Sequence, residues 1–111
     1  MEVIKLKEQE TVVNSRGVSV KHLFDRKDVA VYDVILQPGQ TLPAHITPVD
    51  VFFYVIAGKG QVQIGDETVE VNATDLIISP AGIPHGLTAD QENAFSVMVV
   101  KTPNPQCFRK N

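Results

Sequence analysis

Apolar and polar residues alternate along most of this chain, in short runs that end at turn residues. The clearest run is 18–24, where Val18, Val20, His22 and Phe24 fall on one face and Ser19 and Lys21 on the other. This period of two is typical of a strand with one buried face. Further strands are predicted at 29–37, 61–64, 68–71, 75–79, 85–89 and 95–101. No stretch has the period of an amphipathic helix, so the pattern predicts an all-β sandwich or barrel.

The longest apolar run, 51–57, contains no charged residue and indicates a strand that is buried on both faces. A short extended piece that carries His45 precedes it, and Gly58-Lys59-Gly60 predicts a tight reversal after it. A second histidine, His85, follows the proline-rich loop 80–84. Two histidines placed at strand ends, beside stiff loops, suggest a binding site.

Length and composition are those of one globular domain. The chain has 111 residues, of which 43% are hydrophobic and 21% charged. We expect an N-terminal edge strand or arm at 1–17, a barrel at 18–102 and a C-terminal tail at 103–111, because the tail's prolines cannot continue a strand ladder. The single cysteine, Cys107, excludes an intrachain disulfide and is expected to be a surface thiol.

The charge pattern narrows the choice of partners. The formal net charge is −3, and lysines and arginines are scattered rather than clustered, so a nucleic-acid interface is not expected. An anionic small molecule is still compatible, since one well-placed Lys or Arg can bind it. No apolar run approaches the ~18 residues of a membrane span, and the first ten residues lack the apolar core of a secretory signal. We therefore expect a cytoplasmic protein with no membrane partner.

Two motifs resemble those of the cupin superfamily, over roughly residues 37–101. The first family motif is glycine, five residues, His-x-His, three or four residues, glutamate, six residues and glycine, and Gly39, His45 and Gly58 fit it. The second contains Pro-x-Gly, two residues and histidine, and Pro80, Gly82 and His85 fit it. Four positions depart: Thr47 replaces the second histidine, Val51 the glutamate, Thr74 the glycine that opens the second motif, and Ala89 its final asparagine.

The resemblance implies a jelly-roll β-barrel, also called a double-stranded β-helix, built as one small domain. It also implies a site where three histidines and a carboxylate converge on Mn, Fe, Ni, Cu or Zn. Only His45 and His85 of that set are present here. His22 could supply a third ligand, and Asp50 could do so if a bulge turned it inward. The expected cofactor is therefore either none or a divalent transition metal in a noncanonical site.

Side-chain parity predicts the pocket and the outer surface. If His45 faces inward, then Thr47, Val51, Phe53 and Val55 do so too. We expect a ligand pocket lined by His45, Thr47, Val51, Phe53 and His85. The residues Phe52, Tyr54 and Ile56 must then face outward, and the same argument applies less strongly to Ile77. An outer face this apolar needs a cover, which is either a second subunit or the chain's own N-terminal segment; of the two we predict a homodimer.

Three functions are compatible with these observations. The first is a stand-alone cupin that binds a small, partly polar molecule, or that uses His45 or His85 as a metal-independent acid or base. The second is a metal-dependent dioxygenase, decarboxylase or sugar isomerase that uses the same two histidines. The third is a structural or regulatory dimeric module. The substrate is not specified, because this fold supports many unrelated functions.

Overall fold

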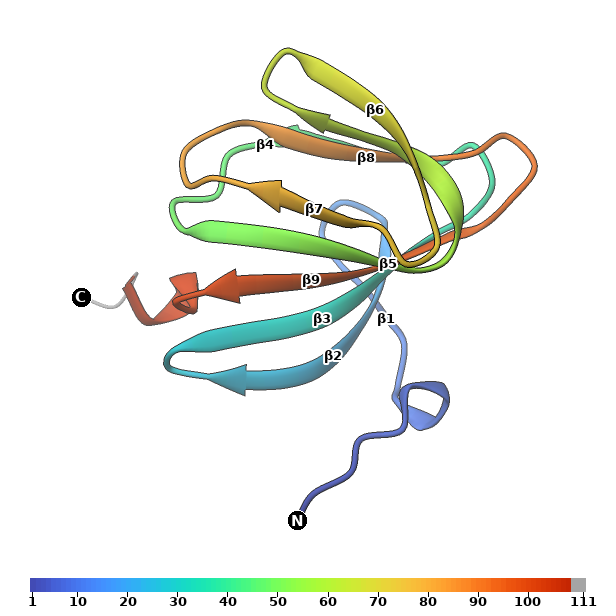
Figure 1. The fold of residues 1–111 in the computed structure, drawn as a ribbon. Coiled ribbons are helices and arrows are strands. Elements are labelled where there is room, and N and C mark those ends of the chain that lie inside the picture. The colour runs from blue at the N-terminus through green and yellow to red at the C-terminus, as the bar shows by residue number, and fades with distance from the viewer. Residues whose placement is uncertain (109–111) are drawn as a thin grey trace.

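The computed structural model describes residues 1–108 and is built almost entirely of antiparallel strands (Figure 1). The strands are β1 (Val12–Val13), β2 (Ser19–Arg26), β3 (Val29–Leu36), β4 (Thr41–His45), β5 (Asp50–Ile64), β6 (Glu67–Asn72), β7 (Leu76–Ser79), β8 (His85–Ala89) and β9 (Phe95–Thr102). Two short 3₁₀ helices, η1 (Leu6–Glu8) and η2 (Pro105–Phe108), lie near the ends of the chain. The all-β prediction is confirmed.

The strands form two layers that share one long strand. The first layer has the order β1-β2-β3-β9-β5-β7, and the second has the order β4-β8-β5-β6. The first half of β5 pairs with β9 and β7, and its second half pairs with β8 and β6. Figure 1 shows β5 bending from the lower layer into the upper one. The result is the expected jelly-roll barrel, closed along one side by β5.

The expected tight reversal at Gly58-Lys59-Gly60 is wrong, because β5 runs through these residues without a break. They form the bend that carries the strand between layers. A Cβ atom on Gly58 would lie 1.8 Å from the Ala94 carbonyl oxygen, and one on Gly60 would lie 2.3 Å from the Thr88 carbonyl oxygen. Only glycine permits so close an approach of two backbones.

The core lies between the two layers and follows the predicted parity along β5. Val51, Phe53 and Val55 are buried, whereas Phe52, Tyr54 and Ile56 are partly exposed on the outer face. Ile77 was expected outside but pairs with Phe53 and packs against the core. Its neighbours Leu76 and Ile78 are the residues of β7 that are exposed, at 56% and 64%. The inward-facing and outward-facing positions of β7 are therefore shifted by one residue from those that the sequence pattern predicted.

The segment before β2 is an arm with little regular structure. Its two-residue strand β1 pairs with the start of β2, and the Lys21 side chain donates a hydrogen bond to the Leu6 carbonyl at 3.0 Å. This contact holds the arm beside the outer face of the first layer. None of the helices in residues 1–108 is long and apolar enough to cross a membrane.

Candidate functional site

The two histidines of the motifs meet at one end of the barrel. Strands β4 and β8 pair so that His45 lies directly opposite His85. The ring centroids are 4.8 Å apart, and the rings are nearly perpendicular at 88°. Cross-strand pairing thus joins two residues that are forty positions apart in the sequence.

His85 is buried, and both of its ring nitrogens have protein partners. Its Nδ1 lies 2.7 Å from the Ser79 hydroxyl oxygen, and its Nε2 lies 3.3 Å from the Thr47 hydroxyl oxygen. The Phe53 ring packs edge-on against it, with centroids 5.2 Å apart. The side chain is 3% exposed. A neutral imidazole has one donor and one acceptor nitrogen, so the two hydroxyls satisfy it completely.

His45 has one nitrogen engaged and one free. Its Nδ1 lies 3.1 Å from the Pro43 carbonyl oxygen. A carbonyl oxygen can only accept, so Nδ1 carries the proton and Nε2 keeps its lone pair. Within residues 1–108, Nε2 has no hydrogen-bond partner. His45 therefore presents a hydrogen-bond acceptor, or a weak base, to the barrel mouth.

Both imidazoles are held in the neutral form. Burial lowers the pKa of His85 from 6.5 to about 4, and the nearby His45, Lys101 and Arg16 act in the same direction. Burial also lowers the pKa of His45. The hydrogen bond to the Pro43 carbonyl acts in the opposite direction, because it favours the protonated ring. Loss of hydration and the two cations both disfavour an imidazolium here. At neutral pH the pair therefore carries no charge.

A cavity of about 340 Å³ opens above this pair at the barrel mouth. Its polar or charged lining residues are Asn14, Ser15, Arg16, Tyr32, His45, Thr47, Lys101 and Gln106, and its apolar ones are Val34, Leu42, Ile46, Pro48 and Pro105. They come from the turn before β2, from β3, from β4 and the β4–β5 connection, from the end of β9 and from η2. This volume is at the lower end of the range for small-molecule pockets.

The five predicted pocket residues lie at two different depths in the barrel. His45 and Thr47 line the cavity. Val51, Phe53 and His85 are all buried, at 2–3% exposure, and form the packed core beneath it rather than its wall. Two of the predicted residues thus line the cavity at the barrel mouth, and three lie in the core beneath it.

The two candidates for a third metal ligand lie elsewhere. The Asp50 carboxylate accepts a hydrogen bond from the Ala81 backbone N–H at 2.9 Å and so anchors the proline-rich loop. His22 packs beside Tyr32, with ring centroids 6.0 Å apart, and lines an adjoining cavity instead. In the described part of the chain, no three His, Cys, Asp or Glu side chains are grouped so that they could hold a metal ion. The Cys107 side chain lies outside the described part.

The donor set does not fit the metal site that the cupin resemblance implies. A metal between the two imidazoles would need a free nitrogen from each, but Thr47 and Ser79 already engage both nitrogens of His85. Val51 puts an apolar side chain where an anionic ligand would be needed. One free imidazole nitrogen is too few donors for tight binding of a divalent transition metal.

Sequence reasoning missed the cations of the cavity. Lys101 lies over the Tyr32 ring, with its ammonium 5.2 Å from the ring centroid, and Arg16 lies in the turn before β2. A signal for Lys101 was present, because it continues the inward parity of Val97 and Val99 to the mouth end of β9. No comparable signal existed for Arg16, whose position depends on how the turn folds back.

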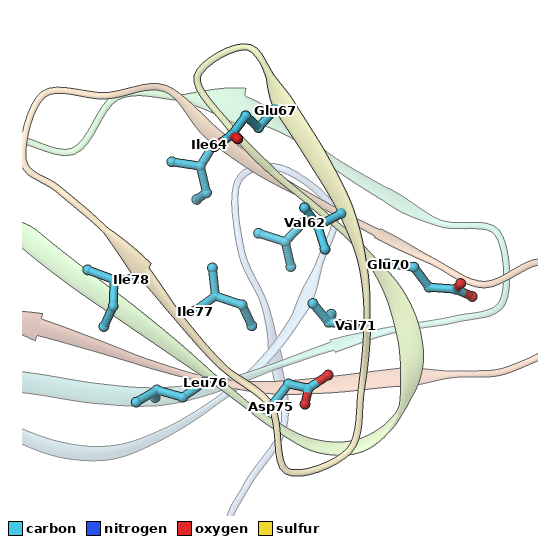
Figure 2. A pocket seen from close by; sticks show the side chains of 10 residues that line it. Val62, Ile64, Glu67, Glu70, Val71, Asp75, Leu76, Ile77 and Ile78 are labelled. Carbon is cyan, nitrogen blue, oxygen red and sulfur yellow. The ribbon is translucent and has the colours of Figure 1, made fainter.

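A second cavity, of about 450 Å³, lies between β6 and β7 (Figure 2). Figure 2 shows Val62, Ile64 and Ile77 directed into this space, with Glu70 and Asp75 at its border. The charged residues that line it are Glu67, Glu70 and Asp75, and all three are acidic. Within residues 1–108, β6 and β7 each pair with β5 alone, so this lateral groove is the opening between the free edges of the two layers.

Comparisons with known proteins agree with this fold. Residues 32–101 match the family model for the cupin domain. A conserved protein of unknown function from Streptococcus pyogenes is 30% identical, with a TM-score of 0.72, and the match covers 91% of this chain and 86% of that one. The TT1209 protein of Thermus thermophilus is 25% identical, with a TM-score of 0.81 and coverage of 93% and 98%.

A more distant structure shows the fold alone. The polyketide cyclase RemF from Streptomyces resistomycificus is 19% identical, with a TM-score of 0.82, and the match covers 92% of this chain and 79% of that one. The comparison with curated proteins finds no match.

Proposed function

Since the chain belongs to the cupin family but does not have the ligands of a four-ligand metal site, we propose that it binds a small, partly polar molecule at the barrel mouth without a metal. The ligand occupies the cavity of about 340 Å³ above the histidine pair. His45 accepts a hydrogen bond from it through Nε2. His85 has a structural role and supports the floor of the cavity through Ser79 and Thr47.

The observation that carries this proposal is the contrast between the two imidazoles. One has both nitrogens satisfied inside the protein, and the other has a free acceptor beside an open cavity. A buried residue with satisfied polar atoms contributes to folding, whereas an unpaired acceptor in a cavity is a feature of binding sites. The same free nitrogen can accept a proton, so a metal-independent acid–base reaction would use His45 as well.

Elemental analysis tests the metal-free part of the proposal. The protein is purified without a histidine tag or chelator, and Mn, Fe, Ni, Cu and Zn are measured per chain. We expect less than about a tenth of an equivalent, because one free imidazole binds these ions weakly. Close to one equivalent, lost in the His45→Ala/His85→Ala double variant, would contradict the proposal and favour a metal-dependent enzyme.

A titration with a neutral probe tests the binding part. Mandelamide has an aromatic body and a hydroxyl donor, and its binding is followed in the ¹H–¹⁵N spectrum of the wild type, His45→Gln and His22→Gln. We expect binding to weaken in His45→Gln and to be unchanged in His22→Gln, since His22 lies outside this cavity. Equal binding by all three proteins would contradict the role of His45. No binding by any of them would favour a purely structural module.

We also infer that the chain pairs with a second copy of itself through the outer face of the first layer. Leu76 and Ile78 are 56% and 64% exposed there, beside the partly exposed Phe52 and Tyr54. A contiguous apolar surface of this kind is typical of an interface between subunits. Light scattering after size exclusion should give twice the 12.2 kDa chain mass, and Ile78→Glu should give the monomer. A wild-type monomer at micromolar concentration would contradict this.

A further inference from the structure

The cations at the barrel mouth identify the chemical class of the ligand, and this inference rests on the proposed function. We propose that the cavity binds a small hydroxy acid. Its carboxylate lies between Arg16 and Lys101, and its hydroxyl donates to His45 Nε2. The remaining body of the ligand packs against the apolar wall.

Among residues 1–108, two positively charged side chains and no acidic one line the cavity. Arg16 and Lys101 come from different parts of the chain, the turn before β2 and the end of β9, and both line the same cavity. Among the described residues neither forms an ion pair, since the ion pair found there joins Lys59 to Asp90. Cations that converge on a cavity without a carboxylate partner are suited to bind an anion.

The adjoining cavity does not neutralise this charge. It shares Tyr32, Lys101, Pro105 and Gln106 with the barrel mouth, and its acidic residue is Asp25. The Asp25 carboxylate accepts a hydrogen bond from the Asn104 side-chain amide and makes no ion pair with Lys101 in the described part of the chain. Lys101 instead lies over the Tyr32 ring, which positions its ammonium and leaves its hydrogen-bond donors available for a ligand.

The free nitrogen of His45 adds a second requirement. Its Nδ1 proton is committed to the Pro43 carbonyl, so Nε2 can only accept a hydrogen bond. A carboxylate alone cannot satisfy a lone pair, because an ionised carboxylate has no donor. The ligand must therefore carry a hydroxyl or a similar donor near its anionic group. Both cations lie close enough to disfavour protonation of His45, which keeps this acceptor available.

The rest of the cavity limits size and polarity. Val34, Leu42, Ile46 and Pro48 form an apolar wall, and the volume of about 340 Å³ is enough for a compact molecule but not for a large cofactor. Mandelate has the three required features, because it combines a carboxylate, an adjacent hydroxyl and one aromatic ring. Two analogues each lack one of these features: mandelamide has no charge, and phenylacetate has no hydroxyl.

Calorimetric titration of the wild-type protein with the three probes tests the inference. Mandelate should bind at least about tenfold more tightly than mandelamide, as expected for hydrogen bonds to a charged group. It should also bind more tightly than phenylacetate, and its affinity should fall with added salt. Arg16→Gln and Lys101→Gln should each weaken mandelate binding about tenfold and weaken mandelamide binding much less, because the neutral amide makes no charged contact with them. Lys59→Gln is the matched control, because it removes a lysine that lies outside this cavity.

The outcomes separate this inference from the proposed function. If mandelate and mandelamide bind equally, and Arg16→Gln and Lys101→Gln have no effect, the anionic class is wrong while binding at the mouth stands. If phenylacetate binds as tightly as mandelate, the hydroxyl requirement is wrong. Displacement of mandelate by an equal concentration of inorganic phosphate would overturn the carboxylate assignment. If none of the probes binds below about 10 mM, both the inference and the proposed function fail.

Discussion

The barrel mouth and the lateral groove are cavities of similar size but opposite charge. The mouth has a volume of about 340 Å³ and is lined by Arg16 and Lys101, whereas the groove has about 450 Å³ and its charged residues are Glu67, Glu70 and Asp75. The chain as a whole has a net charge of −3, which agrees with the groove and not with the mouth. Net charge therefore says little about a site that a few residues create.

The two regions also differ in how their polar groups are used. At the mouth, cations and a free imidazole nitrogen face a cavity, and the buried histidine beneath them is fully hydrogen-bonded. At the groove, Glu67 and Glu70 lie on β6, whose free edge is open to solvent. Charged side chains on an edge strand discourage pairing with another chain. The free edge of β6 thus explains the acidic side chains of the groove. It does not explain the cations at the mouth.

The largest effect is expected from a change that disrupts both regions together. β5 contributes to the core beneath the mouth and to the wall of the groove, and Gly60 lies at the bend between its two halves. In Gly60→Ala the new Cβ would lie 2.3 Å from the Thr88 carbonyl oxygen and 2.7 Å from the Phe95 ring. We expect a loss of roughly 3 kcal/mol or more in the free energy of unfolding, or no folded protein.

Urea unfolding monitored by circular dichroism measures this loss. Gly82→Ala is the control, because nothing lies within 4 Å of its added Cβ although the residue has a φ of +79°. It should cost only about 1 kcal/mol, from the left-handed backbone conformation alone. Equal losses in the two variants would contradict the close approach at the β5 bend.

Acid should destabilise the fold through the buried histidine beneath the mouth. The pKa of His85 is about 4 in the folded protein, below its ordinary value of 6.5, mainly because the ring is buried. Between these values the unfolded chain binds a proton that the folded chain does not. The free energy of unfolding should therefore fall as the pH drops from 6.5 to 4, by up to about 1.4 kcal/mol per pH unit from this group.

Imidazole resonances followed by NMR across the acid and neutral range measure the pKa directly. Unfolding of His85→Gln over the same range should depend less on pH than that of the wild type. A measured pKa for His85 at or near the ordinary histidine value would contradict its desolvated, fully bonded environment.

A smaller change should affect only the groove side. Thr74 lies in the turn between β6 and β7 and has a φ of +78°, in a region that β-branched residues rarely adopt. Thr74→Gly should raise the free energy of unfolding by about 1 kcal/mol, because relief of this conformation exceeds the entropy cost of glycine. Mandelate affinity at the mouth should not change. Thr68→Gly on β6 is the matched control and should be destabilising; a loss of stability in Thr74→Gly would contradict the account.

Much of the fold was predictable from local pattern. The two-residue period placed most strands and correctly assigned the inner and outer faces of 51–55. The motif departure at Thr74 also has a physical meaning, because the backbone there has the conformation that glycine would adopt without strain. The bend at Gly58 and Gly60 was mistaken for a reversal, since glycines that permit a close approach look the same in sequence as glycines in a turn.

The candidate site was less predictable, because it depends on contacts between distant segments. His45 and His85 could be paired through the motifs, but the hydrogen bonds that make one structural and leave the other free depend on Ser79, Thr47 and Pro43. Lys101 could have been found by continuing the parity of β9. Arg16 reaches the cavity from a turn, and no periodic pattern places a turn residue.

The most direct test of the central claim is to map where mandelate binds. Chemical-shift changes in the ¹H–¹⁵N spectrum during a mandelate titration should concentrate at the mouth, on residues 14–16 and 45–48 and on Lys101. Residues 67–71 and 75–78 of the lateral groove should shift little. Saturable changes at the groove, with none at the mouth, would contradict the assignment of the cationic cavity as the binding site.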